Sequence, residues 1–208
     1  MKRAAKAQHS KDRIISAATK EFSGKSYDTA SLNNICNDNE ISKGLIYHYF
    51  GHKDDLYLSC IKTCFEKFTI FLAQEVYDFS DFRHGVNQYL ARRLLFFRTY
   101  PQEAQLFFYT VLQPPKHLTS QIQELKAAFD AQCIGYYQEA LAHITLREGV
   151  SEKNALSYFS LLQKLFNQYF QDNIAANVDF DSLMQTHEDQ LSNILNIMLY
   201  GIAKENVK

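Results

Sequence analysis

The sequence contains few of the residues that interrupt helices. Its 208 residues include only 7 Gly and 3 Pro, while 46% of them are hydrophobic. This composition is typical of a folded, mainly helical chain and argues against a β-rich or a disordered one. The length allows one large or two small domains with a sizeable hydrophobic core. We therefore expect an all-α protein.

Long apolar segments are also missing. The chain has no run of 18 or more apolar residues, and its first residues lack the apolar stretch of a signal peptide. These absences predict a cytoplasmic protein with no membrane partner. The 4 cysteines are then expected to be reduced thiols. Cys60 and Cys64 lie one helical turn apart, but no further ligand stands at metal spacing beside them, so we favour core packing over a sensor role.

Motifs that carry catalysis are absent from the sequence. There is no Gly-rich phosphate loop, no plausible Ser/His/Asp order and no Cys/His cluster. We therefore predict that the protein is not an enzyme and has neither a cofactor nor a metal site.

Charge is unevenly distributed along the chain. The net charge is −1, but residues 1–62 hold 10 Lys/Arg and 7 Asp/Glu, whereas residues 63–208 hold 12 and 16. The first segment is therefore net basic and the second net acidic. A basic N-terminal segment followed by an acidic remainder suits nucleic-acid binding by the N-terminal segment alone.

The stretch 42–50 has two different faces if it is helical. Ile46 and Phe50 are four residues apart and would point into a core. Ser42 is a favourable N-cap, which places the positive end of the helix dipole at the start of this stretch. The opposite face is cationic and aromatic and contains Lys43, Gly44, Tyr47 and His48.

A second short helix is predicted just upstream. Ser31 is able to cap it, Leu32 and Ile35 would face inward, and it would end near Asp38. Residues 39–41 would then form the turn. Two short helices joined by a tight turn, the second with a basic and aromatic face, make a helix-turn-helix.

The run from Ser31 to Phe50, with Lys53-Asp54-Asp55-Leu56 after it, resembles the DNA-binding domain of the TetR family of transcriptional regulators. One position departs from the family pattern, because the turn residue that is usually Gly is Glu40 here. A left-handed backbone at this residue would cost about 1 kcal/mol, and its carboxylate would repel DNA phosphates.

The resemblance implies a domain division and a set of DNA contacts. Residues 1–52 would be the DNA-binding domain and 53–208 a helical effector-binding and dimerisation domain. The basic segment 1–10 would be either a frayed tail or an arm that contacts phosphates. The residues expected to read bases are Lys43, Gly44, Tyr47 and His48, although Tyr47 is also placed to reach phosphate. The residues expected to hold phosphates are Ser31, Tyr49 and Lys53.

The apolar spacing predicts helices through the rest of the chain. Pro101, Pro114 and Gly149 mark helix boundaries. The predicted helices span residues 11–23, the long segment from Lys53 to about Phe71, and then 81–99, 101–112, 117–144, 151–175 and 181–202.

Two further sites are predicted in the larger domain. Its aromatic residues suggest an effector pocket lined by Arg92, Phe96, Phe108, Tyr109, Tyr136 and Phe166. The arginines of this region would otherwise be solvated or paired with carboxylates. The last two helices are apolar on two faces, which resembles the dimer-forming helices of the family. The predicted interface residues are Phe159, Phe166, Leu191, Leu195, Met198 and Leu199.

These features lead to one main hypothesis and one alternative. We expect a homodimeric, ligand-responsive repressor that binds a near-palindromic double-stranded DNA operator and is released by a small hydrophobic or aromatic effector. The alternative is a TetR-like interaction module that acts through a protein partner and binds DNA weakly, which Glu40 would favour.

Overall fold

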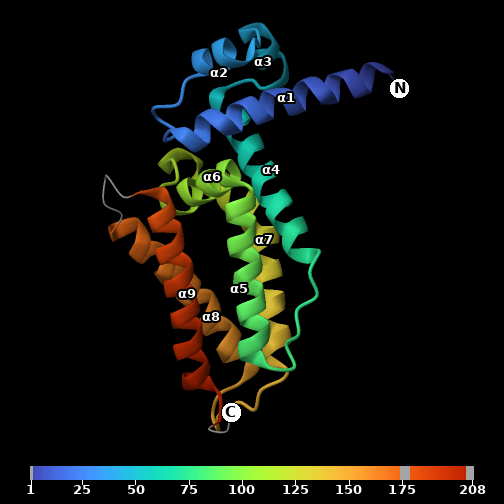
Figure 1. The fold of residues 1–208 in the computed structure, drawn as a ribbon. Helices are drawn as coiled ribbons and strands as arrows, with labels where there is room; N and C mark the ends of the chain where they lie inside the picture. The colour runs from blue at the N-terminus through green and yellow to red at the C-terminus, as the bar shows by residue number, and fades with distance from the viewer. Residues whose placement is uncertain (1, 174–178, 205–208) are drawn as a thin grey trace. The chain divides into compact units, whose positions relative to one another are not determined.

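The structure, a computed structural model, describes residues 2–173 and 179–204, and its regular secondary structure in these ranges is helical apart from an isolated bridge between Leu146 and Ala203 (Figure 1). The all-α prediction is confirmed. The helices are α1 (Lys2–Gly24), α2 (Leu32–Asn39), α3 (Lys43–Tyr49), α4 (Lys53–Ala73), α5 (Phe82–Thr99), α6 (Pro101–Leu112), the 3₁₀ helix η1 (Lys116–Leu118), α7 (Thr119–Leu141), α8 (Glu152–Asn173) and α9 (Phe180–Ile202).

The chain divides into two compact units. The first contains residues 1–67 and 99–127, and the second contains residues 68–98 and 128–208. Helices α4 and α7 contribute residues to both units by these bounds. The predicted division of function after residue 52 is a different boundary, and it stays a prediction.

In the first unit, α1 supports the short helices that follow it. Ile14, Ala18 and Phe22 are buried at the predicted four-residue spacing. The Phe22 ring contacts Tyr57 of α4 edge-on, with 4.9 Å between the ring centres. Helix α6 packs against α1 in the same unit (Figure 1). The first unit therefore has an aromatic and aliphatic core of its own.

The start of α1 differs from the sequence prediction. The helix begins at Lys2 and not at Lys11, so residues 2–10 are helical and not an extended tail. The prediction relied on apolar spacing, which this segment lacks. Its helix is favoured instead by its alanines and by local polar contacts, such as the 2.7 Å hydrogen bond that Gln8 Nε2 donates to Asp12 Oδ1.

The caps and the turn of the helix-turn-helix agree with the prediction. The hydroxyl of Ser31 accepts a hydrogen bond from Asn33 N, and that of Ser42 accepts one from Leu45 N. Helix α2 ends at Glu40, whose φ of 52° and ψ of 40° are left-handed. The N–H of Ile41 then donates to Cys36 O over 3.1 Å, which closes the helix end.

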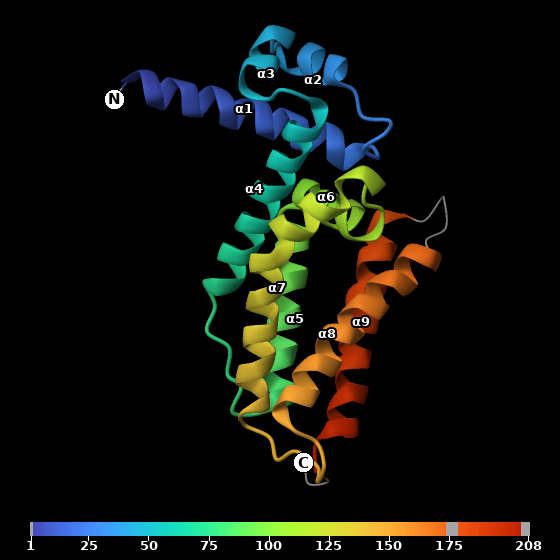
Figure 2. The same cartoon turned by 180° about the vertical axis from the view of Figure 1, so that it is seen from behind.

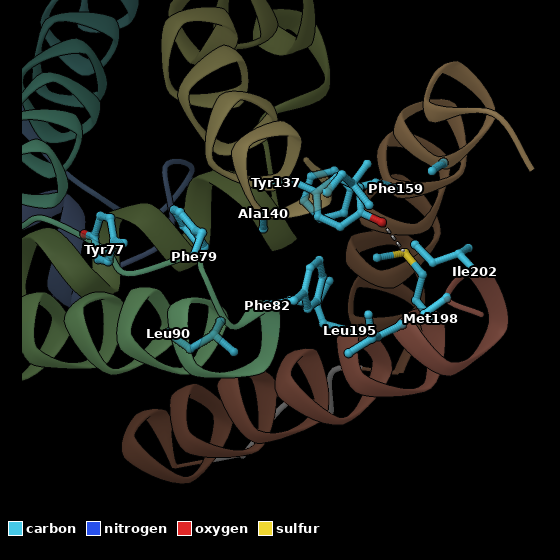
Figure 3. Close-up of a cluster of buried hydrophobic side chains, with 14 residues drawn as sticks. Tyr77, Phe79, Phe82, Leu90, Tyr137, Ala140, Phe159, Leu195, Met198 and Ile202 are labelled. Carbon is cyan, nitrogen blue, oxygen red and sulfur yellow. Dashed lines mark hydrogen bonds between the residues drawn. The ribbon is translucent and has the colours of Figure 1, made fainter. Parts of the chain in front are cut away.

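The second unit has an extensive core between α5, α7, α8 and α9. Figure 3 shows its buried cluster, in which the Tyr137 and Phe159 rings stack with centres 4.1 Å apart. Figure 1 and Figure 2 both show α8 and α9 side by side, and the two helices are in contact. Residues from the last two helices thus complete the core of a single protomer.

This core contains most of the residues predicted for the dimer interface. Phe159, Leu195, Met198 and Leu199 belong to the buried cluster, and Leu199 has no exposed surface at all. Phe166 is buried as well, and Leu191 packs against the cluster. The broad apolar stripes of α8 and α9 gave no sign of which face lies inward in the protomer, and the location of the dimer interface stays a prediction. The large hydrophobic residues that these helices expose are Tyr158, Leu161, Leu165, Tyr169, Ile197 and Tyr200.

A buried ion pair joins α5 to α9 inside the second unit. The Nε and one terminal nitrogen of Arg93 each donate to a different carboxylate oxygen of Glu188 over 2.9 Å. Nδ1 of His187 lies 3.1 Å from one of these oxygens. Burial alone would raise the pKa of Glu188, but the Arg93 guanidinium lowers this pKa to about 2. The pair is therefore charged at neutral pH.

Two of the cysteines lie in the protein core, and the described helices are also informative about membrane insertion. Cys60 and Cys64 are buried free thiols, as core packing predicts. Burial raises the pKa of both thiols, which disfavours the reactive thiolate. Among the described helices, none combines the length and the hydropathy needed to cross a bilayer.

The left-handed turn residue yields a stability prediction. Glu40→Gly should raise the free energy of unfolding by up to about 1 kcal/mol and the melting temperature by about 1–4 °C, because Gly adopts positive φ without strain. Glu40→Ala keeps the β-carbon and should melt close to the wild type. Thermal unfolding followed by circular dichroism measures both variants, and equal melting temperatures for Gly and Ala would contradict the strain argument.

Candidate nucleic-acid interface

Helix α3 buries one face and exposes the other. Ile46 and Phe50 are 1% and 3% exposed and fix the helix on the first unit. The outward face holds Lys43, Gly44, Tyr47 and His48, all exposed, with Tyr47 at 49%. The structure thus brings the predicted base-reading residues together on one surface of a seven-residue helix.

Lys43 is held by a residue that sequence reasoning missed. Its Nζ donates to Oδ1 of Asn33 over 3.2 Å, which links the first turn of α3 to the first turn of α2. The contact orients an exposed ammonium group without neutralising it, since Asn carries no charge. Asn33 gives no sequence signal for this role, because the contact depends on how the two helices cross.

Gly44 has no packing role inside the protomer. A β-carbon built at this position would meet no other heavy atom within 4 Å. Gly inside a helix is about 1 kcal/mol less favourable than Ala. The protomer itself therefore has no need of Gly at this position.

The predicted phosphate-binding residues lie on both sides of this face. Ser31 caps α2, and the Tyr49 ring contacts His48 edge-on with 5.0 Å between the ring centres. Lys53 is the first residue of α4. Its Nζ donates to the backbone oxygen of Tyr27 and lies 4.4 Å from the centre of the Tyr27 ring. Burial lowers the pKa of Lys53, although nearby carboxylates oppose this effect. Lys53 thus has an intramolecular role that the sequence did not indicate.

Glu21 of α1 anchors the start of α2. Its Oε1 accepts hydrogen bonds from Ser31 N and Asn34 Nδ2, each over 3.0 Å, and from Lys25 Nζ over 2.9 Å. Burial would raise the pKa of this carboxyl, but the three hydrogen bonds together lower it below its ordinary value. The carboxylate thus orients the cap of the helix that precedes the turn.

Arg13 extends from α1 to the end of α2, and Lys11 extends from α1 to the end of α3. A terminal nitrogen of Arg13 donates to Asn39 O over 2.6 Å, directly before the left-handed residue. Nζ of Lys11 lies 5.8 Å from the centre of the Phe50 ring, at the end of α3. These contacts fix the turn and the recognition helix on α1, and neither was predicted.

This geometry agrees with comparisons with known proteins. Residues 14–60, which run from α1 into α4, match the family described as bacterial regulatory proteins, tetR family. This segment is therefore similar to the DNA-binding domain of TetR-family regulators. The relatives and solved structures that the chain resembles are transcriptional regulators and not enzymes, in line with the sequence prediction.

Relatives and solved structures extend the similarity beyond the matched segment. The biofilm operon icaADBC HTH-type negative transcriptional regulator IcaR of Staphylococcus epidermidis is 26% identical over 91% of this chain and 98% of its own. A TetR family regulator from Chloroflexus aurantiacus shares the fold, with a TM-score of 0.58, 21% identity and 95% of each chain covered. FadR from Bacillus subtilis, solved in complex with stearoyl-CoA, has a TM-score of 0.60 and 17% identity over 86% of this chain and 96% of its own.

The residues predicted for an effector pocket of this chain are dispersed. Phe96, Phe108 and Phe166 are buried, and Phe166 packs against His187 with 4.7 Å between the ring centres. Phe108 and Tyr109 belong to the first unit, whereas the other four belong to the second. Tyr136 lines a small apolar cavity of the second unit. The pocket stays a prediction.

Arg92 makes contacts of the kind that the sequence offered as the alternative to a ligand role. Its guanidinium stacks 3.8 Å from the centre of the Phe71 ring, donates to Phe71 O and lies 3.6 Å from a carboxylate oxygen of Glu75. These contacts occupy the charged end of the side chain with groups of its own unit.

The Glu21 contacts generate a pH-dependent prediction. Glu21→Gln should lower the free energy of unfolding by about 1 kcal/mol at pH 7, because the charge that strengthens three hydrogen bonds is lost. The folded-state pKa is lowered, so this stabilisation is present above the unfolded pKa and is lost as the pH falls through the folded pKa. The difference between wild type and variant should therefore shrink below about pH 4.

Urea unfolding at pH 7 and at about pH 3, which lies below the ordinary pKa of a glutamate, measures this difference. Glu66→Gln is the matched control, because Glu66 lies 3.9 Å from Lys62 with both side chains about 60% exposed, and such pairs contribute little. A Glu21→Gln variant that is as stable as the control at pH 7 would refute the anchoring role.

Proposed function

We propose that this protein is a cytoplasmic, ligand-responsive TetR-family repressor that binds a near-palindromic DNA operator as a homodimer. The observation that carries the proposal is the outward face of α3, a cationic and aromatic surface on a helix whose other face is buried. A helix of this kind fits the major groove of DNA.

The exposed face of α3 is suited to reading base edges. Lys43 is a donor for guanine O6 and N7, and His48 and Tyr47 offer further polar atoms. Gly44 lies between them and has open space around it, so a base or sugar is able to approach the backbone closely. This explains a Gly that the packing of the protomer does not require.

Contacts to phosphate are supported by the helix starts beside this face. Ser31 caps α2 and Lys53 begins α4, so backbone N–H groups and the positive ends of two helix dipoles lie near these side chains. Helix α1 begins with a basic segment that contains Lys6 and His9, both exposed. A helical arm of this kind presents its charges at fixed spacing along a phosphate backbone.

Dimerisation is supported by an apolar surface that the protomer leaves uncovered. Tyr158, Leu161, Leu165 and Tyr169 follow one another at helical spacing along the outer face of α8 and are 48–57% exposed. Ile197 and Tyr200 are exposed on α9. A second copy, related by a twofold axis, is the occupant that this surface fits, since one stripe then covers the other.

Repression and release by an effector are supported by similarity. IcaR is named as a negative regulator, and FadR was solved with a small molecule bound. An effector that binds one conformation of the second unit better than another would change the affinity for the operator. Operator binding would then change the affinity for the effector by the same factor. The exposed Glu40 carboxylate favours the rival function, a module with weak DNA binding that acts through a protein partner.

A first experiment separates base reading from phosphate binding. Lys43→Ala should weaken operator binding by about 1–3 kcal/mol and relax the preference at one base position, while random-sequence DNA is affected much less. Lys53→Ala should weaken binding to all sequences alike and reduce the salt slope by about one unit per half-site. Gel shifts with the DNA upstream of the protein's own gene and with random DNA, at several salt concentrations, measure both.

Each outcome of this experiment has a distinct meaning. Equal losses on operator and random DNA for Lys43→Ala would remove the base-reading role of Lys43. Weak, salt-sensitive binding of the wild type, with no sequence preference, would favour the interaction module. Because Lys53 contacts Tyr27 within the protein, the melting temperature of Lys53→Ala has to be measured beside its DNA affinity.

A second experiment tests the dimer surface. Replacing Leu161 and Leu165 by Glu should give a folded monomer with weakened operator binding, because the substitutions place charges in the uncovered stripe. Leu195→Glu is the contrasting control and should unfold the protein, since Leu195 lies in the protomer core. Sedimentation equilibrium and circular dichroism measure both, and a double variant that remains a dimer would place the interface elsewhere.

A further inference from the structure

A small cavity lies within the second unit, among side chains of α5, α7, α8 and α9. Tyr89, Cys133, Tyr137 and Phe159 are among the residues that line it. Figure 3 shows Tyr137 and Phe159 stacked beside Leu195, which also lines the cavity. Its walls are therefore mainly aromatic and aliphatic.

Two phenol hydroxyls of this wall pair with sulfur atoms. The hydroxyl of Tyr137 donates to Sδ of Met198 over 3.6 Å, the contact drawn in Figure 3. The hydroxyl of Tyr89 lies 3.1 Å from Sγ of Cys133. Either the Tyr89 hydroxyl or the Cys133 thiol is the donor of this second contact. Sulfur is both a weak donor and a weak acceptor, so both phenols would gain by donating to a ligand oxygen instead.

A third tyrosine of the same aromatic cluster provides a contrast. Tyr77 packs edge-on against Tyr136, with 4.9 Å between the ring centres, but its hydroxyl donates to the backbone oxygen of Leu72 over 2.7 Å. A backbone carbonyl is a strong acceptor, so the hydroxyl of Tyr77 has nothing to gain from a ligand oxygen.

The cavity is unsuited to a charged ligand. None of its described lining residues is acidic or basic. The Arg93 guanidinium lies 5.8 Å from the centre of the Tyr89 ring, but its charge is neutralised by the bidentate contact with Glu188. Burying an ion without a partner is strongly unfavourable. Burial also raises the pKa of Tyr89 and of Tyr137, so both phenols remain protonated donors.

The cavity is also small. The space open to the centre of a water-sized sphere is only about 30 Å³. A long acyl thioester such as the stearoyl-CoA bound to FadR is both charged and far larger. The present packing therefore selects a compact molecule.

We propose that this cavity binds a compact, uncharged, mainly apolar molecule with an acceptor oxygen, such as a small ketone, whose oxygen takes the place of sulfur at Tyr89 or Tyr137. The apolar part of the molecule contacts Phe159 and the neighbouring rings, and the oxygen sets its orientation. This inference rests on the proposed function, because it names the class of effector, and its test is therefore first carried out without DNA.

The test compares two probes of nearly the same shape. Cyclopentanone carries the acceptor oxygen, and methylenecyclopentane has a CH₂ group in its place. Binding of each probe to the full-length protein is measured by NMR titration. The ratio of ketone to hydrocarbon affinity should be about fivefold higher in the wild type than in a variant that lacks the partner hydroxyl, the factor expected for one neutral hydrogen bond. This factor is the preference for the ketone, and comparing variants cancels the different hydration of the two probes in water.

Three variants locate the oxygen. Tyr89→Phe or Tyr137→Phe should abolish the preference for the ketone while leaving hydrocarbon binding unchanged, because each variant keeps the ring and removes only the hydroxyl. Tyr77→Phe is the matched control and should keep the preference. The carbonyl ¹³C shift of the bound ketone should also move as it does on hydrogen bonding, which is measurable on the wild type alone.

Several results would overturn the inference. No binding of either probe, an unshifted carbonyl resonance, or an affinity ratio that is the same in the wild type, Tyr89→Phe and Tyr137→Phe each contradict it. Operator binding is then measured with saturating ketone. A ketone that binds as described but leaves operator affinity unchanged supports the cavity and refutes its role as the effector site.

Discussion

A helix that packs on one side has to expose the other, and this constraint organises both units of the protein. In α3 the burial of Ile46 and Phe50 determines that Lys43 and Tyr47 face outward. The burial of Phe159 and Phe166 in α8 likewise turns Leu161 and Leu165 to the surface. The polar outer face of α3 suits DNA, and the apolar outer face of α8 suits a second copy. Both surfaces follow from the composition of the faces that are not buried.

The stability of the short helices α2 and α3 in the first unit depends on side-chain contacts more than on helix length. An eight-residue and a seven-residue helix are too short to be stable alone in water. Glu21 holds the start of α2, Arg13 holds its end, and Ser42 caps α3. The strained residue Glu40 is tolerated because hydrogen bonds fix the turn on both sides of it. The orientation of α3 is therefore determined mainly by polar contacts to α1 and by two apolar residues.

Local signals in the sequence were sufficient for much of the architecture. Ser31 and Ser42 were recognised as caps, and the left-handed turn was anticipated at Glu40, because each of these features depends on a few adjacent residues. The helix boundaries at Pro101 and after Leu112 followed from prolines for the same reason.

Features that depend on tertiary packing were not predictable in this way. The start of α1 was missed because alanines, and not apolar spacing, support it. The faces of α8 and α9 that lie inward in the protomer were not identified, because both faces are apolar and only the path of the chain decides which one meets α5 and α7. The contacts of Lys43 with Asn33 and of Lys53 with Tyr27 join residues 10 and 26 positions apart, for which spacing gives no signal. The candidate cavity likewise depends on which side chains the fold brings together.

The buried contact between Arg93 and Glu188 has a consequence for how this protein is able to vary during evolution. Removing one partner leaves an uncompensated charge in the core, which typically destabilises a protein by about 3–5 kcal/mol, whereas replacing both with apolar residues is often tolerated. Drift at either position alone is therefore strongly selected against. The two positions, on α5 and α9, should be inherited as a unit, and descendants of this protein should carry either both charges or neither.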